Sequence, residues 1–192
     1  MIDKKSFEVM RKEMEAFDKG RESLIKISRD VLKFSKGAIY SLHRSEIETA
    51  DNQLKEARKI ISEMNSMIKK DAHLASVGSY NEALEEYVEA SCYFEFLKSK
   101  KIPSPKDLGV DTDTYLPGLC DLVGELVRKA MNSAIKGDLK LAAEIKDFVS
   151  EIYEELMLFD FRNIPVRRKF DAIKYGLEKL EDLMVKIKFK EK

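Results

Sequence analysis

Helical periodicity that persists over long stretches is the feature that most constrains the fold of this chain. Within residues 24–42 the apolar side chains recur every three or four positions and share one arc of a helix: Leu24, Ile27, Val31, Phe34, Ala38 and Leu42. Only four prolines and eight glycines occur in 192 residues, so little interrupts such stretches. The sequence therefore predicts an all-α chain with long N-terminal helices.

The same signals predict an antiparallel bundle of six or seven helices. A chain of this length fits one large domain better than two, so residues 1–192 are expected to form a single domain. Asp113 or Thr114 is the expected cap of the fourth helix, and Pro165 suits the first turn of the last. The expected helices cover residues 4–44, 45–70, 78–100, 113–136, 138–159 and 165–189, with a loop over 101–105.

Several classes of protein find no support in the sequence. No run reaches the roughly 18 apolar residues of a membrane span, and the N-terminus lacks a secretory apolar region. No membrane contact is therefore expected, and the lack of metal-ligand spacing between Cys92 and Cys120 favours a cytoplasmic protein with reduced thiols. There is no Gly-rich phosphate loop, no Cys-His metal cluster and no nucleophile elbow.

Charge is unevenly distributed along the chain, although Lys+Arg and Asp+Glu balance at 35 each. Residues 71–97 and 107–127 contain acids but no Lys or Arg, and they carry −6 and −5. The remainder therefore carries +11, whereas ordinary solvated helices intersperse the two signs. One interpretation is a basic surface for a polyanion and acidic clusters for a cation. The alternative is a chance run, or acids that pair with bases brought close by tertiary structure.

A basic stripe lies opposite the apolar arc of the first helix. A row of cations with an aromatic and a histidine suits a phosphate backbone, but a solvated polar face would have the same pattern. His43 by itself is more typical of a surface or hydrogen-bonded histidine than of a ligand. The stripe consists of Lys26, Arg29, Lys33, Lys36, Tyr40, His43 and Arg44.

Two like-charge pairs stand at helical spacing, Glu86 with Glu89 and Asp121 with Glu125. Each pair destabilises an isolated helix by roughly a few tenths of a kcal/mol. A bound divalent cation would turn this repulsion into coordination, because Mg²⁺ and Mn²⁺ take oxygen ligands from carboxylates. Such an ion can activate the attacking group and stabilise the leaving oxygen of a phosphodiester. Acidic pairs at this spacing are common, so the pattern alone is weak evidence for a metal site.

Four segments of the chain, in order, resemble the translin / Trax (translin-associated factor X) family. The most specific is the stretch from Asp113 to Arg128, which reads DTYLPGLCDLVGELVR. The others are the Arg21–Arg44 segment with its Ser-Arg-Asp, Ser-Lys and Leu-His-Arg elements, the Glu-Tyr-Val-Glu-Ala run at 86–90, and the Val-Arg-Arg-Lys-Phe-Asp run at 166–171.

The resemblance is to the Trax branch, which carries the Glu-Tyr-Val-Glu pair and the aspartate of Asp-Leu-x-Gly-Glu-Leu as a metal-dependent ribonuclease site. It implies that Glu86, Glu89 and Asp121 bind Mg²⁺ or Mn²⁺, with Glu125 as a catalytic neighbour. The Trax branch has one more glutamate a turn before Glu86. Here Ala83 stands three residues back and Glu82 four, so Glu82 fills that role or the role is missing.

The resemblance also implies a seven-helix fold and a compact, single-component archaeal type of member, which assembles as a homo-octamer enclosing RNA. The expected function is a cytoplasmic, metal-dependent endoribonuclease. A translin-like protein that binds RNA or single-stranded DNA without cutting it is the alternative, and a purely structural helical assembly is a third. The residues expected to hold the RNA backbone are Lys26, Arg29, Lys33, Lys36, His43, Arg44, Arg167 and Arg168.

Overall fold

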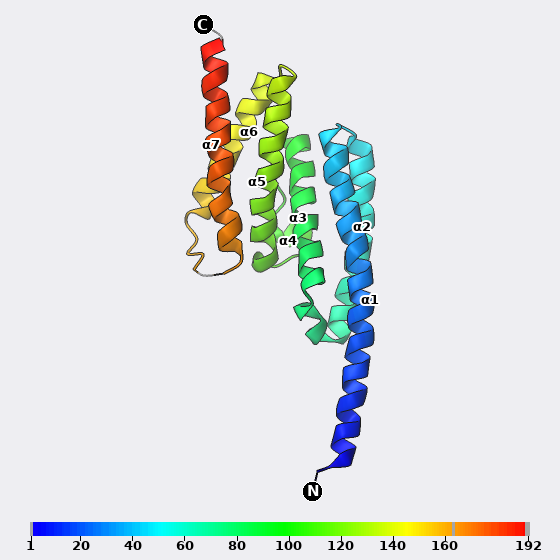
Figure 1. Cartoon of the computed structure of the whole chain (residues 1–192). Helices are drawn as coiled ribbons and strands as arrows, with labels where there is room; N and C mark the ends of the chain where they lie inside the picture. Colours follow the sequence, from blue (N-terminus) through cyan, green and yellow to red (C-terminus); the bar gives the residue numbers. More distant parts are fainter. Residues whose placement is uncertain (1, 163, 191–192) are drawn as a thin grey trace. The chain divides into compact units, whose positions relative to one another are not determined.

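The computed structural model describes residues 2–162 and 164–190, and within these ranges it contains helices and no strand (Figure 1). This confirms the predicted all-α class and the seven-helix architecture. A short 3₁₀ turn, η1 (Ala72–Ser76), precedes the third helix. The helices are α1 (Lys4–His43), α2 (Ile47–Lys70), α3 (Gly78–Ser99), α4 (Pro105–Leu108), α5 (Thr112–Ile135), α6 (Leu139–Leu156) and α7 (Val166–Lys190).

The chain divides into two compact units, Met1–Phe94 and Glu95–Lys192. Helix α3 contributes to both, because its residues up to Phe94 belong to the first unit and its last turn belongs to the second. The expectation that residues 1–192 form one domain stays a prediction.

In the first unit, α1 and α2 pack side by side and run in opposite directions through the short turn at 44–46 (Figure 1). The predicted apolar arc of α1 faces this contact, with Leu24, Val31, Ala38 and Leu42 fully buried and Ile27 and Phe34 half-buried. Burial of such an arc, rather than helix propensity, supplies most of the stability of a helix in a protein. The matching arc of α2 consists of Ala50, Leu54, Ala57, Ile61 and Met64.

In the second unit, α5 packs against both α6 and α7, and these two also contact each other. Phe96, at the end of α3, stacks on Phe148 of α6 with ring centroids 4.6 Å apart. Gly176 lets α7 approach α5 closely, because a Cβ atom there would lie 3.1 Å from a methyl group of Val127. The buried arc of α5 consists of Leu119, Leu122, Val123, Leu126 and Ala130.

Most helix boundaries lie within a few residues of the predicted ones, and the differences have local causes. Helix α5 begins earlier than expected because Asp111, not Asp113 or Thr114, is its cap and accepts a hydrogen bond from the Thr114 amide at 2.8 Å. The expected 101–105 loop leads into the short helix α4, which Ser104 and Asp107 begin as a capping box. Helix α6 ends at Leu156 rather than near Phe159.

No helix in the described part of the chain is both long and apolar enough to cross a membrane.

Candidate nucleic-acid and metal-binding residues

The basic stripe of α1 lies on the solvent side of that helix. Lys26, Arg29, Lys33 and Lys36 are all exposed, whereas Leu24 and Val31 on the opposite side are fully buried. Tyr40 extends the same face and keeps 54% of its surface exposed. These four predicted cations therefore form one exposed row, spaced three or four residues apart. Such a row suits repeated contacts with phosphates.

The two ends of the predicted stripe differ from its middle. Arg44 donates two hydrogen bonds of 2.8 Å to Glu46, through Nε and Nη2, and this carboxylate raises the pKa of the guanidinium. Its charge is thus partly neutralised. His43 is half-buried, and its Nδ1 lies 3.3 Å from the hydroxyl of Tyr93, with ring centroids 5.2 Å apart. This confirms the interpretation of His43 as a hydrogen-bonded histidine.

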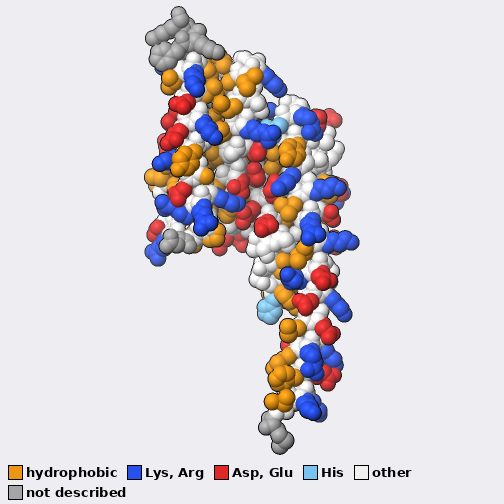
Figure 2. Space-filling view, in the orientation of Figure 1, with side chains coloured by type: hydrophobic (Ala, Val, Ile, Leu, Met, Phe, Trp, Pro, Cys, Tyr) orange, Lys and Arg blue, Asp and Glu red, His pale blue; other side chains and the backbone are white. Residues whose placement is uncertain are grey.

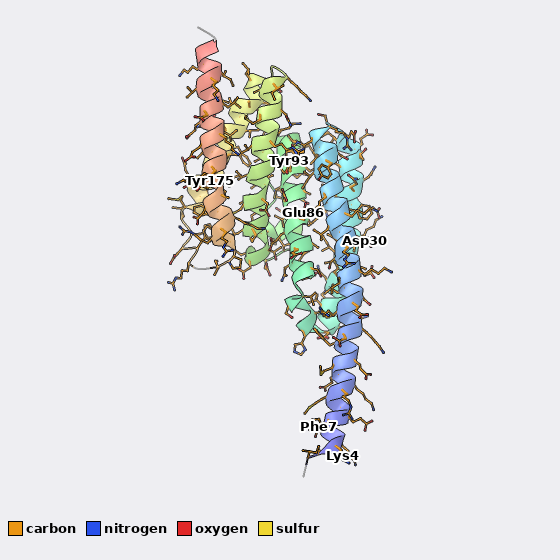
Figure 3. The ribbon with its side chains drawn as sticks, in the orientation of Figure 1. Lys4, Phe7, Asp30, Glu86, Tyr93 and Tyr175 are labelled. Atoms are coloured by element: carbon orange, nitrogen blue, oxygen red, sulfur yellow. The ribbon has the colours of Figure 1, made fainter. Side chains whose placement is uncertain are left out.

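On α3 the predicted acids differ in burial. Glu82 is exposed, the side chain of Glu86 keeps 19% of its surface exposed, and Glu89 is buried with 8% exposed. Lys36 reaches across from α1, so that its Nζ lies 3.7 Å from Oε2 of Glu86. Figure 3 marks Glu86 on α3 and Asp30 on α1. The basic stripe and the acidic pair of the first unit are therefore in direct electrostatic contact.

A tyrosine between the two glutamates anchors this part of α3 to its own unit. Tyr87 is 1% exposed, and its hydroxyl accepts a hydrogen bond of 3.0 Å from Nε of Arg58 on α2. A buried tyrosine usually satisfies its hydroxyl in this way. Since Glu86 adjoins Tyr87 in the chain, the Arg58 contact helps to fix the rotation of α3, and with it the direction of the acidic pair.

In the second unit, Asp121 on α5 forms a short ion pair with Lys169 of α7. The Nζ atom of Lys169 donates to Oδ2 of Asp121 at 2.6 Å, and both side chains are about one-third exposed. Glu125, one turn further along α5, lies 3.7 Å from Nη1 of Arg128. The second predicted acidic pair thus also has cations beside it. Of the two contacts, the 2.6 Å charge-assisted hydrogen bond between Lys169 and Asp121 is the strong one.

Cys120, next to Asp121, carries no thiolate near neutral pH. Burial, together with the neighbouring Asp121 charge, raises the pKa of its thiol to about 12, while Lys169 acts in the opposite direction. Because the thiolate is the nucleophilic form of cysteine, this residue has no role as a nucleophile at neutral pH.

The predicted cations of α7 are placed differently from those of α1. Arg167 pairs with Asp171 one turn along the same helix, at 3.0 Å, and lies over the ring of Phe170 at 5.8 Å. Arg168 is exposed. The structure therefore directs one of these two arginines toward its own helix and leaves the other on the surface.

Sequence reasoning named Arg167 and Arg168 but missed Lys169, which contacts Asp121. A signal was present in the helical phase. The buried side chains of α7 include Val166, Phe170 and Ile173, and position 169 falls on the same arc. A lysine on an apolar arc needs an anionic partner or a route to water, so its position indicated an acidic neighbour.

The donor chemistry of these residues suits a hard divalent cation, because carboxylate oxygens are the ligands that Mg²⁺ and Mn²⁺ take. Within residues 2–162 and 164–190, however, no group of three or more His, Cys, Asp or Glu side chains is arranged to hold a metal ion. The assignment of Glu82, Glu86, Glu89, Asp121 and Glu125 to a metal site remains a prediction.

The helices and charges described above define a class of protein: an all-α bundle with an exposed basic helix face and lysine-neutralised carboxylates. A sequence model of the translin family matches residues 19–191. The chain belongs to the translin family, as its sequence motifs predicted.

Relatives and solved structures extend this likeness over nearly the whole chain. An uncharacterized protein of Methanocaldococcus jannaschii is 30% identical, over 84% of this chain and 73% of that protein. Translin-associated protein X of Mus musculus is 26% identical, over 95% of this chain and 77% of its own. A chain of AfC3PO, solved in complex with duplex RNA, is 28% identical with a TM-score of 0.84, covering 96% of this chain and 97% of that one.

Proposed function

We propose that this protein binds RNA and hydrolyses its phosphodiester bonds as a divalent-metal-dependent endoribonuclease. RNA binding is supported by the likeness to the AfC3PO chain solved with duplex RNA, together with the exposed row of cations on α1. Lys26, Arg29, Lys33 and Lys36 would contact phosphates, and sequence-independent binding of this kind falls steeply with salt. His43, Arg44, Arg167 and Arg168 would contribute less, because three of them have partners within the protein.

The catalytic half of the proposal rests on the carboxylates. Glu86, Glu89 and Asp121 would bind Mg²⁺ or Mn²⁺, with Glu125 as a further ligand or base and Glu82 as the candidate for the remaining position. The bound ion would supply an activated water and a positive charge beside the leaving oxygen. One observation supports this: Glu86 and Glu89 stand one turn apart on α3 and are both largely withdrawn from solvent. Two nearby carboxylates with little access to water repel each other, so a bound cation would stabilise their ionised form.

The resemblance to the family also carries the expectation of self-association, as a homo-octamer enclosing RNA. Sedimentation of the purified protein measures the mass of the particle and so tests the number of subunits.

The decisive experiment incubates the purified protein with end-labelled RNA in Mg²⁺, Mn²⁺ or EDTA. We expect Glu86→Gln and Asp121→Asn to lower the cleavage rate by about a hundredfold or more while RNA affinity is retained, because each removes an anionic ligand without changing side-chain shape. Asp113→Asn, at an exposed position of the same helix as Asp121, is the matched control and should cut normally. Wild-type rates in both site variants would refute the assignment.

A second candidate function is binding of RNA or single-stranded DNA without cleavage. It is favoured by the lysines that already neutralise Glu86 and Asp121, and by the lack of a three-ligand group among the described residues. In that case binding is salt-sensitive but unaffected by EDTA, and no products form with Mn²⁺. The same incubation distinguishes the two functions.

A further inference from the structure

The N-terminal part of α1 extends well past the end of α2 and η1 within the first unit (Figure 1). The first fully buried side chain of the helix is Leu24. Before it, large apolar side chains face solvent: Phe7 is 48% exposed, Met10 52% and Met14 68%. Figure 2 shows hydrophobic side chains along one side of this projecting segment and charged ones along the other.

These apolar residues continue the repeat that packs the rest of α1. Phe7, Met10, Met14 and Phe17, here called the N-terminal stripe, are spaced by three, four and three residues. After Arg21 the same alternation of threes and fours continues through the fully buried positions Leu24, Ser28, Val31, Ser35, Ala38 and Leu42. A seven-residue apolar repeat is typical of a helix that packs lengthwise against another helix. The stripe therefore continues an existing interface beyond the point where α2 ends.

A helix of this kind gains most of its stability from packing. A segment of roughly 12–15 residues is only marginally helical in water by itself, and burial of an amphipathic face is what normally stabilises it. Within the first unit, Phe17 at the end of the stripe is half-buried, and three residues later Gly20 lies close to Leu74 of η1, since an added Cβ would be 3.4 Å from a leucine methyl group. The stripe thus has the chemistry of a helix–helix contact and lies outside the core of its unit.

The charges that surround the stripe are balanced in sign, which bears on the kind of partner it suits. Residues 3–19 contain five acids (Asp3, Glu8, Glu13, Glu15, Asp18) and five bases (Lys4, Lys5, Arg11, Lys12, Lys19). A polyanion or an anionic membrane surface requires an excess of bases, which this segment lacks. A surface with both signs in balance, around an apolar seam, is suited to a copy of itself.

We propose that the N-terminal stripe packs antiparallel against the N-terminal stripe of a second copy of this chain. The inference rests on the self-association proposed above and names one surface for it. In this register Phe7 lies opposite the partner's Phe17, and Met10 lies opposite the partner's Met14. Because both copies present the same patch, the contact closes on itself as a two-fold interface.

Flanking charges favour the antiparallel orientation. Antiparallel pairing places Lys4 beside the partner's Asp18 on both sides of the two-fold axis. It also points the two helix dipoles in opposite directions, which is the favourable arrangement. Parallel pairing would instead place Glu13 beside the partner's Asp18 twice. The antiparallel register also sets Arg11 and Glu13 near their own counterparts at the axis, a cost that limits the strength of the contact.

The test introduces charge into the N-terminal stripe, in what is here called the seam variant. Met10→Glu/Met14→Glu is compared with Val9→Glu/Ala16→Glu, which adds the same charge to the same helix away from the stripe. Sedimentation velocity measures the particle mass at micromolar concentration, and circular dichroism confirms that helicity is retained. We expect the seam variant to lower the mass at least twofold, with a dissociation constant about a hundredfold higher, while the control keeps the wild-type mass.

The outcomes separate this inference from the function it rests on. A monomeric wild-type protein would refute both the self-association and the stripe. A wild-type assembly that survives the seam variant, or that the control disrupts equally, would refute the stripe alone. Orientation is tested with cysteines: oxidation should cross-link the Met10→Cys/Met14→Cys variant between subunits. Efficient cross-linking of Met10→Cys by itself would indicate parallel pairing and overturn the antiparallel register.

Discussion

In each of the two units a lysine on one helix contacts a carboxylate on another, but the two contacts differ in strength. In the second unit, Nζ of Lys169 lies 2.6 Å from Asp121, which is a direct hydrogen-bonded ion pair. In the first unit, Nζ of Lys36 lies 3.7 Å from Glu86, beyond hydrogen-bond distance. Lys36 is also more exposed than Lys169, at 56% against 34%.

The difference reflects where each lysine stands on its helix. Lys169 falls on the buried arc of α7, so it needs its acidic partner, whereas Lys36 belongs to a solvent-facing row of cations. Lys36 is therefore part of an outward-facing row of bases, whereas Lys169 is engaged within its own unit. On this comparison we expect a polyanion to bind chiefly to the first unit.

Replacing the middle of the α1 stripe should weaken RNA binding more than replacing the arginines of α7. We expect Lys26→Gln/Arg29→Gln/Lys33→Gln to lower RNA affinity by about a hundredfold at moderate salt. The slope of log affinity against log salt concentration should fall by the amount that corresponds to about two to three lost phosphate contacts. Arg167→Gln/Arg168→Gln should cost about tenfold or less, because Arg167 already pairs with Asp171. Fluorescence anisotropy over a salt series measures both. Equal losses in the two variants would contradict the division between the units.

Burial separates two glutamates on the same helix. Glu89→Ala should lower the free energy of unfolding by about 1–3 kcal/mol, because it truncates a buried side chain and leaves its polar contacts unmatched. Glu82→Ala, at an exposed position, should change it by less than about 0.5 kcal/mol. Urea denaturation followed by circular dichroism gives both values. If the two variants proved equally stable, Glu89 would not be an integral part of the packing of α3.

The strength of the two lysine contacts predicts different effects on metal affinity. A lysine beside a carboxylate competes with a metal ion for it, so Lys169→Met should increase Mn²⁺ affinity by up to about tenfold. Lys36→Met should have the smaller effect, since its contact with Glu86 is longer. Isothermal titration with Mn²⁺ measures both. A loss of affinity in Lys169→Met would show instead that the lysine positions Asp121.

Much of the fold could be predicted from periodicity and helix caps. The long α1, the short turn after it and the order of the helices follow from the spacing of apolar residues, because a helix must bury one continuous arc. The expected cap of α5 was wrong by two or more residues, since Asp111, Asp113 and Thr114 are all good capping residues and only hydrogen bonding selects among them. The short η1 and α4 had no periodic signal of their own.

For the candidate site, the sequence predicted which acids and bases carry the charge but not how they pair. The acid-rich windows favoured a cation ligand and left pairing with distant bases as the alternative. For Glu86 and Asp121 the structure shows that such bases are present, Lys36 and Lys169, fifty and forty-eight residues away in the chain. The metal site itself stays a prediction.

The sequence by itself determined the all-α class and the basic face of α1, because these depend on local spacing along a helix, and its motifs indicated the family. Only tertiary structure decided that Lys169 contacts Asp121, that Glu89 is buried while Glu82 is exposed, and that the apolar repeat of α1 outruns its partner helix. The physical reason is that burial and ion pairing depend on which helices lie against one another, and no periodicity within a single helix specifies its neighbour.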